Sequence, residues 1–122
     1  MYQSEIVGIG PLALDFLAEK MLILYGANAP VELAEISVLH QHGPLEGAIE
    51  VGDLFYLGQE AYQVTAVGSE ANHTFASMGH CSLYFGDKAG ASLPGTIELK
   101  GKKLPEIQLG DQIQIIKGQK EA

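Results

Sequence analysis

Two histidines separated by one residue stand at the end of a short apolar run, in the segment His40-Gln41-His42-Gly43. On an extended strand, alternate side chains point to the same face. The two imidazoles are therefore predicted to lie together, with their Cα atoms roughly 6–7 Å apart. Near neutral pH an imidazole can act as a base, a nucleophile or a metal ligand. The pair is the first place to look for chemistry in this chain.

The residue types leave three interpretations of the pair open. A neutral, exposed imidazole could accept a phosphoryl group, with His42 donating a hydrogen bond to it and the backbone N–H groups at Gly43 cradling its oxygens. The pair could instead be half of a zinc or nickel site, completed by His80 or Glu46. It could also be a surface pair without a role. No nucleotide-binding loop with its lysine is present, so a phosphoryl group would have to come from another protein.

His80 and Cys81 are the other reactive side chains that the sequence singles out. His80 enters a predicted strand and is a weaker candidate for the same site; the alternative is a ring hydrogen-bonded to the backbone. Cys81 is the single cysteine, which excludes an internal disulfide. It lacks the electropositive surroundings that a reactive thiolate needs, so we expect it in the core.

Composition indicates one acidic domain over residues 1–122. Hydrophobic residues make up 47% and charged residues 18%, which is typical of a folded globular chain. The net charge of −8, with lysines clustered only at 100–103, argues against nucleic acid and anionic lipid as partners. No apolar run is long enough to span a membrane, and no signal-peptide pattern opens the chain. We therefore expect a cytoplasmic protein without membrane insertion.

Short apolar stretches between turn residues, with fifteen glycines, predict mainly β structure as a sandwich or small barrel. Helices are predicted over Pro11–Ala18, largely buried, over Ser69–Met78, and briefly over Val31–Glu35. The predicted strands are Tyr2–Ile9, Met21–Tyr25, Ile36–His42, Ala48–Val51, Leu54–Leu57, Ala61–Val67, Cys81–Phe85, Gly95–Leu99 and Gln112–Lys117. The predicted core contains Ile6, Leu22, Leu24, Val38, Val64, Val67, Leu83, Phe85, Ile97 and Ile113.

Several stretches of the chain together resemble one known family. The most specific are His40-Gln41-His42-Gly43-Pro44-Leu45-Glu46-Gly47-Ala48 and Val64-Thr65-Ala66-Val67-Gly68-Ser69. They are similar to the glucitol/sorbitol-specific enzyme IIA component of the phosphoenolpyruvate-dependent sugar phosphotransferase system. Further agreement comes from Met21-Leu22-Ile23, Gly26-Ala27, Pro30, Gly79-His80, Phe85 and Pro94-Gly95-Thr96.

The resemblance implies an all-β fold, a small closed β-barrel with short helical additions, and a cytoplasmic phosphocarrier function without a cofactor or metal. A phosphoryl group would pass from phosphoenolpyruvate through enzyme I and the small protein HPr to a histidine of IIA. It would then pass to a cysteine of IIB in the IIB/IIC membrane permease, and finally to a sugar alcohol during import. The resemblance places the acceptor at His40, where we expect Nε2 to be modified.

Overall fold

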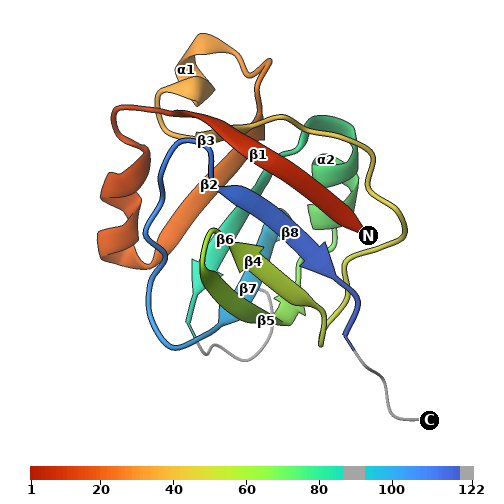
Figure 1. Ribbon diagram of the computed structural model, residues 1–122. Coiled ribbons are helices and arrows are strands. Elements are labelled where there is room, and N and C mark those ends of the chain that lie inside the picture. The colour runs from red at the N-terminus through yellow and green to blue at the C-terminus, as the bar shows by residue number, and fades with distance from the viewer. Residues whose placement is uncertain (87–92, 119–122) are drawn as a thin grey trace, which may run out of the picture.

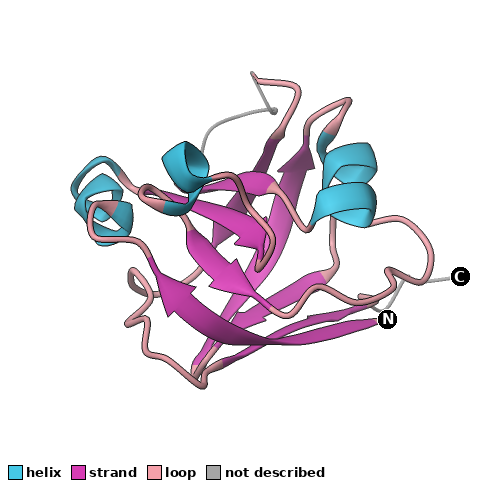
Figure 2. Cartoon of the chain, turned by 90° about the horizontal axis from the view of Figure 1, so that it is seen from above, coloured by secondary structure: helices cyan, strands magenta, loops and turns pink. Residues whose placement is uncertain are grey.

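A computed structural model describes residues 1–86 and 93–118 (Figure 1). Three helical elements occur in this part of the chain: the 3₁₀ helix η1 (Ala13–Glu19), α1 (Val31–Ala34) and α2 (Ala71–Met78). Figure 2 shows them at the periphery of the strands. None of these described helices is long and apolar enough to cross a bilayer. The strands are β1 (Tyr2–Ile9), β2 (Met21–Gly26), β3 (Val38–His40), β4 (Leu54–Leu57), β5 (Glu60–Val67), β6 (Cys81–Phe85), β7 (Thr96–Lys100) and β8 (Gln112–Ile116).

The eight strands of the described residues close into one barrel, in the order β1-β3-β2-β6-β7-β5-β4-β8. The pairs β2 with β3 and β6 with β7 are parallel. The other six pairs are antiparallel. Each of these described strands therefore has a partner on both sides. The predicted fold, a small closed β-barrel with short helical additions, is confirmed.

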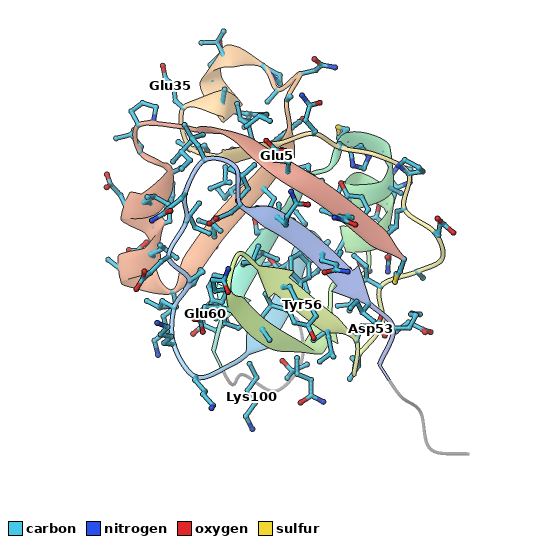
Figure 3. All side chains as sticks on the ribbon, viewed as in Figure 1. Glu5, Glu35, Asp53, Tyr56, Glu60 and Lys100 are labelled. Carbon is cyan, nitrogen blue, oxygen red and sulfur yellow. The ribbon has the colours of Figure 1, made fainter. Side chains whose placement is uncertain are left out.

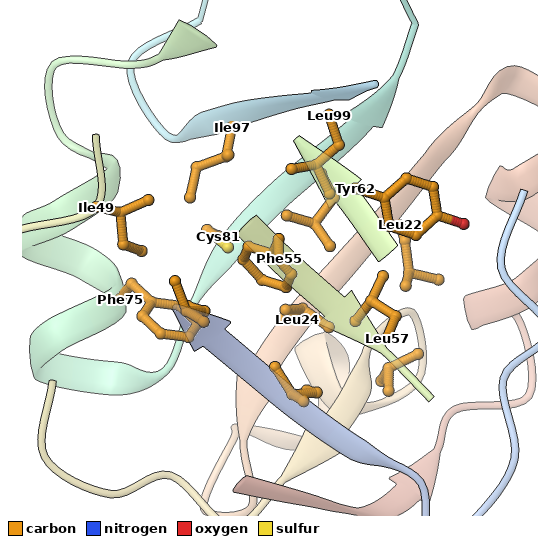
Figure 4. Packing of buried hydrophobic residues seen from close by; sticks show 14 of the residues in the cluster. Leu22, Leu24, Ile49, Phe55, Leu57, Tyr62, Phe75, Cys81, Ile97 and Leu99 are labelled. Atoms are coloured by element: carbon orange, nitrogen blue, oxygen red, sulfur yellow. The ribbon is translucent and has the colours of Figure 1, made fainter. Parts of the chain in front are cut away.

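Alternating apolar side chains on the strands build the core inside the barrel (Figure 4). In β8, for example, Ile113 and Ile115 are fully buried while Gln112 points outward. Every residue of the predicted core is buried except Val67, which is partly buried and packs against the same cluster from the end of β5. Cys81 lies in this core as expected, and burial raises the pKa of its thiol.

The sequence placed too much strand around the histidine pair. The predicted strand Ile36–His42 is a strand only over Val38–His40, and Ala48–Val51 forms none. The backbone N–H and C=O of Ile49 bond to the side-chain amide of Asn72 on α2, at 2.7 and 3.0 Å. Because one amide satisfies both backbone groups, this buried residue needs no strand partner.

The first helix is also shorter and more exposed than predicted. It is a 3₁₀ helix over Ala13–Glu19, and the flanking Leu12 and internal Leu14 are 49% and 39% exposed. A 3₁₀ helix has three residues per turn, so only a narrow stripe can face the barrel. Here that stripe begins at Ala13, which is fully buried.

A buried carboxylate fastens the last strand to the loop before β4. Asp53, labelled in Figure 3, accepts hydrogen bonds from the N–H groups of Glu50 and Gly118 and from Lys117 Nζ at 2.9 Å. Burial alone would raise the pKa of this carboxyl, but the bonds from Lys117 and the two N–H groups together hold it below its usual value. The carboxylate is therefore ionised at neutral pH and ties both segments together.

The barrel core predicts a clear contrast between two leucine substitutions. Leu24→Ala removes a fully buried side chain and should lower the free energy of unfolding by about 2–5 kcal/mol. Leu109→Ala, at a position that is 66% exposed, should change it by less than about 0.5 kcal/mol. Urea unfolding of both variants measures the difference, and similar values for the two would show that the core is misplaced.

Candidate functional site

His40 and His42 do lie together, but a turn rather than a continuous strand brings them there. β3 ends at His40, and the N–H of His42 bonds back to the His40 carbonyl at 2.9 Å. The ring centroids are 5.9 Å apart with an interplanar angle of 81°. The predicted proximity is correct, whereas the strand alternation used to predict it does not extend to His42.

His40 is completely buried, which contradicts the expectation that its imidazole is exposed. Its Nε2 lies 2.8 Å from the carbonyl oxygen of Gly79. Its Nδ1 lies 2.9 Å from Ser4 Oγ and 3.3 Å from Tyr2 Oη. The ring of Phe75 stacks on it at a centroid distance of 5.8 Å. Both ring nitrogens therefore already have hydrogen-bond partners in this state.

The end of α2 explains why His40 is covered. In the sheet, His40 pairs with Ile6 of β1 and with Gly26 of β2. A Cβ atom on Gly26 would lie 2.8 Å from the Met78 carbonyl oxygen, so the missing side chain lets the end of α2 sit against the barrel. Residue spacing around His40 contains no sign of this distant helix, and the exposure prediction failed for that reason.

His42 is the member of the pair that reaches solvent. It is partly buried, with Nδ1 at 2.8 Å from Tyr2 Oη and Nε2 at 2.9 Å from the Ala76 carbonyl oxygen. It also lines an open surface cavity of about 390 Å³, together with Tyr25, Gln41 and other residues. Any group that approaches the pair from outside therefore meets His42 first.

The hydrogen-bond partners decide where each imidazole, in its neutral form, carries its hydrogen. The carbonyl oxygens of Gly79 and Ala76 can only accept, so Nε2 carries the hydrogen in both rings. Each Nδ1 then keeps a lone pair that accepts from a hydroxyl group. The two imidazoles thus cap carbonyl groups at the C-terminal end of α2.

Burial lowers the pKa of His40 below its ordinary value. The Gly79 carbonyl opposes this shift, and the neighbouring His42 adds to it. His40 is therefore neutral at physiological pH. A neutral imidazole is the form that can act as a nucleophile, because protonation would remove its lone pair.

The other predicted site residues differ in how close they come to the pair. Gly43 follows His42 directly, and its backbone partly opposes the burial that raises the pKa of Tyr2. His80 is directed elsewhere: its Nδ1 bonds to the Leu24 carbonyl at 3.0 Å, and its ring stacks on Tyr25 at 4.5 Å. Among the described residues, no group of three His, Cys, Asp or Glu side chains is placed to hold a metal ion.

Sequence reasoning missed Tyr2 and Ser4, which contact the pair from β1. Both are buried on the inward face of that strand, at 4% and 6% exposure. Their alternation with Ile6 was visible in the sequence, but the partner His40 is 36 and 38 residues away along the chain. Only the antiparallel pairing of β1 with β3 brings these hydroxyls to the imidazole.

Comparison with known proteins identifies the family. The sequence model of the glucitol/sorbitol-specific IIA component of the PTS system matches residues 1–114. The chain belongs to this family. It is 40% identical, over 114 residues, to the glucitol/sorbitol-specific EIIA components of Escherichia coli (strain K12) and Shigella flexneri, with 93% of each chain covered.

A solved structure supports the same assignment. The crystal structure of a PTS system IIA component from Enterococcus faecalis V583 is similar, with a TM-score of 0.84 and 29% identity. The match covers 94% of this chain and 99% of that one. The resemblance noted from the sequence is confirmed, and membership of the IIA family gives the chain a phosphotransfer role in a sugar transport system.

Crowding at Gly79 can be separated from backbone strain by two glycine substitutions. Gly79 has φ of 66°, and a Cβ there would meet His40 Nε2 and the Cβ and Cγ of His42, each at 3.0 Å. Gly79→Ala should therefore destabilise more than Gly47→Ala, which has φ of 80° but open space around it. The left-handed conformation alone should cost Gly47→Ala about 1–2 kcal/mol. Equal losses on thermal unfolding would mean that α2 does not press on the pair.

The burial of His40 also predicts how its ring titrates. Since its pKa is lowered, the ring should take up a proton only below the ordinary histidine value of about 6.5. The unfolded chain binds that proton first, so His40 should reduce stability as pH falls through this range. NMR titration of the ring protons, assigned by comparison with His40→Gln, measures the midpoint. A midpoint at or above 6.5 would contradict the buried, neutral ring.

Proposed function

We propose that this chain is a cytoplasmic phosphocarrier for glucitol/sorbitol uptake, in which His40 accepts a phosphoryl group from phospho-HPr. His40 then passes the group to a cysteine of the IIB domain of the IIB/IIC permease. Membership of the IIA family supports the phosphotransfer step. The observation that carries the choice of His40 is its neutral imidazole, held on a strand end by hydroxyl groups.

The transfer needs a change of tautomer and a rearrangement. After the hydrogen has left Nε2 of His40 and Nδ1 has taken one up, the Nε2 lone pair forms the new N–P bond while the N–P bond of the donor breaks, and the electron pair stays on the donor imidazole. In the resting structure Nε2 is capped by the Gly79 carbonyl at 2.8 Å. A phosphoryl group there would also face the carbonyl end of α2, where negative charge is unfavourable. Gly79 and the end of α2 must therefore move away from the ring when the phosphoryl group arrives.

The charges around the histidine pair favour transfer of a phosphoryl group over its retention. Neither lysine nor arginine lies among the described residues that contact the two rings or line the cavity beside His42. Four lysines, Lys20, Lys100, Lys102 and Lys103, line a different cavity. A phosphoryl group on His40 that finds no neutralising cation among these described residues is high in free energy, which favours its transfer to the next carrier.

His42 is well placed to assist, because it lies between His40 and the open cavity. Its Nε2–H now bonds to the Ala76 carbonyl, and it can turn toward the phosphoryl oxygens once α2 moves. Its exposure also makes it the competing acceptor.

The metal-binding alternative is less well supported, since the described residues supply no third ligand. Metal analysis of protein purified without a histidine tag tests that alternative directly.

Phosphorylation by phosphoenolpyruvate, enzyme I and HPr tests the proposal. Wild type should take up one acid-labile phosphoryl group, and His40→Ala should take up none. His42→Ala should still be labelled at His40, but about a hundred- to a thousandfold more slowly, because one hydrogen bond to the transition state is lost. His73→Ala, an exposed position on α2, is the matched control and should behave as wild type.

The opposite labelling pattern of the two histidine variants would contradict the choice of His40. Full labelling of His40→Ala together with none in His42→Ala would make His42 the acceptor. A wild-type protein that takes no label would contradict the phosphocarrier function and favour the alternative of a non-catalytic interaction module with the same fold. NMR of the labelled protein distinguishes phosphate on Nε2 from phosphate on Nδ1.

A further inference from the structure

Two buried hydroxyl groups on β1 meet the Nδ1 atoms of the histidine pair, whereas the Nε2 atoms bond to carbonyl groups at the end of α2. Ser4 Oγ lies 2.9 Å from Nδ1 of His40. Tyr2 Oη lies between the two rings, 3.3 Å from Nδ1 of His40 and 2.8 Å from Nδ1 of His42. The Tyr2 ring is held by Phe75 at a centroid distance of 4.8 Å, and Figure 1 shows the start of β1 beside α2.

The partners of the two His40 ring nitrogens differ in the hydrogen bonds that they can make. The Gly79 carbonyl at Nε2 can only accept a hydrogen bond. A hydroxyl can either donate or accept, by rotating its hydrogen. Ser4 and Tyr2 can therefore donate to an Nδ1 lone pair and accept from an Nδ1–H without any change of position.

The ability of the hydroxyls to donate and to accept matters because phosphorylation at Nε2 requires the other tautomer of His40. The resting ring carries its hydrogen on Nε2, so its lone pair lies on Nδ1. For Nε2 to form a bond to phosphorus, one proton must leave Nε2 and one must reach Nδ1. The ring stays neutral throughout, and the phosphorylated ring keeps its hydrogen on Nδ1, inside the protein.

We propose that the hydroxyls of Tyr2 and Ser4 allow His40 to change tautomer: Ser4 donates to Nδ1 in the resting protein, while Tyr2 donates to His42, and either hydroxyl accepts from Nδ1–H of His40 in the phosphorylated protein. They are positioning residues that act through the imidazole and do not touch the phosphoryl group. The inference rests on the proposed function, in which His40 is the acceptor.

Tyr2 further links the tautomer of His40 to that of His42. When Nδ1–H of His40 donates to Tyr2 Oη, the Tyr2 hydroxyl donates to Nδ1 of His42 at 2.8 Å. Until the end of α2 moves, the Nε2–H of His42 can go on donating to the Ala76 carbonyl at 2.9 Å. The tautomer of His40 that can be phosphorylated is thus compatible with every hydrogen bond that His42 already makes.

Removal of both hydroxyls should slow phosphorylation. Without them, Nδ1–H of the phosphorylated ring would be a buried donor with no acceptor, and such groups are costly. In the Tyr2→Phe/Ser4→Ala double variant we expect phosphoryl uptake from phospho-HPr to fall about ten- to a hundredfold. Each single variant retains one hydroxyl and should fall less, and Ser4→Thr should restore most of the rate.

Two matched controls remove the same chemical groups elsewhere. Ser37→Ala deletes a fully buried hydroxyl for which the described part of the chain offers no hydrogen-bond partner. Tyr62→Phe deletes a buried tyrosine hydroxyl that bonds to the Lys103 carbonyl, not to either ring of the pair. Both controls should take up phosphoryl groups at the wild-type rate.

Nitrogen-15 NMR of the imidazoles supplies a readout that loss of stability would not move. In phosphorylated wild type, the His40 Nδ1–H should appear as a slowly exchanging, hydrogen-bonded proton. It should exchange rapidly in the double variant and stay protected in both controls. If the double variant does not fold, the two single variants and Ser4→Thr provide the same comparison.

The outcomes separate this inference from the function on which it rests. A wild-type protein that is not phosphorylated overturns the proposed function, and the inference with it. Phosphorylation of wild type at His40, with wild-type rates and a protected Nδ1–H in the variants, overturns only the inference. Phosphorylation at His42 that is insensitive to Ser4→Ala also overturns it, because Ser4 contacts only His40 of the pair.

Discussion

The contact between two imidazoles and the C-terminal end of α2 is the interaction on which the site depends. A helix ends with carbonyl groups that have no partner within the helix. Here Nε2–H of His40 and of His42 bond to the carbonyls of Gly79 and Ala76. The same two bonds hold α2 on the barrel, bury His40 and fix the proton position on both rings. Packing and chemistry therefore cannot be altered independently at this end of the barrel.

The barrel provides the rigid side of that contact. β3 is only three residues long, yet it is paired on both sides, with β1 antiparallel and with β2 parallel. The antiparallel neighbour brings two hydroxyls to one nitrogen of His40. The parallel neighbour ends in Gly26, whose missing side chain admits the end of α2. A rigid imidazole with one hydroxyl-lined side and one helix-capped side follows from these pairings.

The proposed transfer through His40 implies that the two sides have different mobilities. The hydroxyls come from a buried strand in the barrel wall, where they can keep the ring aligned during the proposed transfer. The cap comes from an eight-residue helix at the periphery, and α2 is among the less extensively packed elements of the described chain. Elements with few packing contacts open most easily. Because Phe75 of α2 is buried in the core, the opening that the proposed transfer needs is confined to the end of α2 beyond that residue.

The sequence by itself determined the fold class, most strand positions, nearly all of the core and the histidine pair. Strand alternation and turn residues are local signals, and the motif around the pair identified the family. Only the tertiary structure decided that His40 is buried, that Tyr2 and Ser4 hold its Nδ1, and that Asn72 replaces a strand partner for Ile49. These contacts join residues between 23 and 38 positions apart, and none has a local pattern to reveal it. They arise from barrel closure and helix docking, which depend on the whole chain.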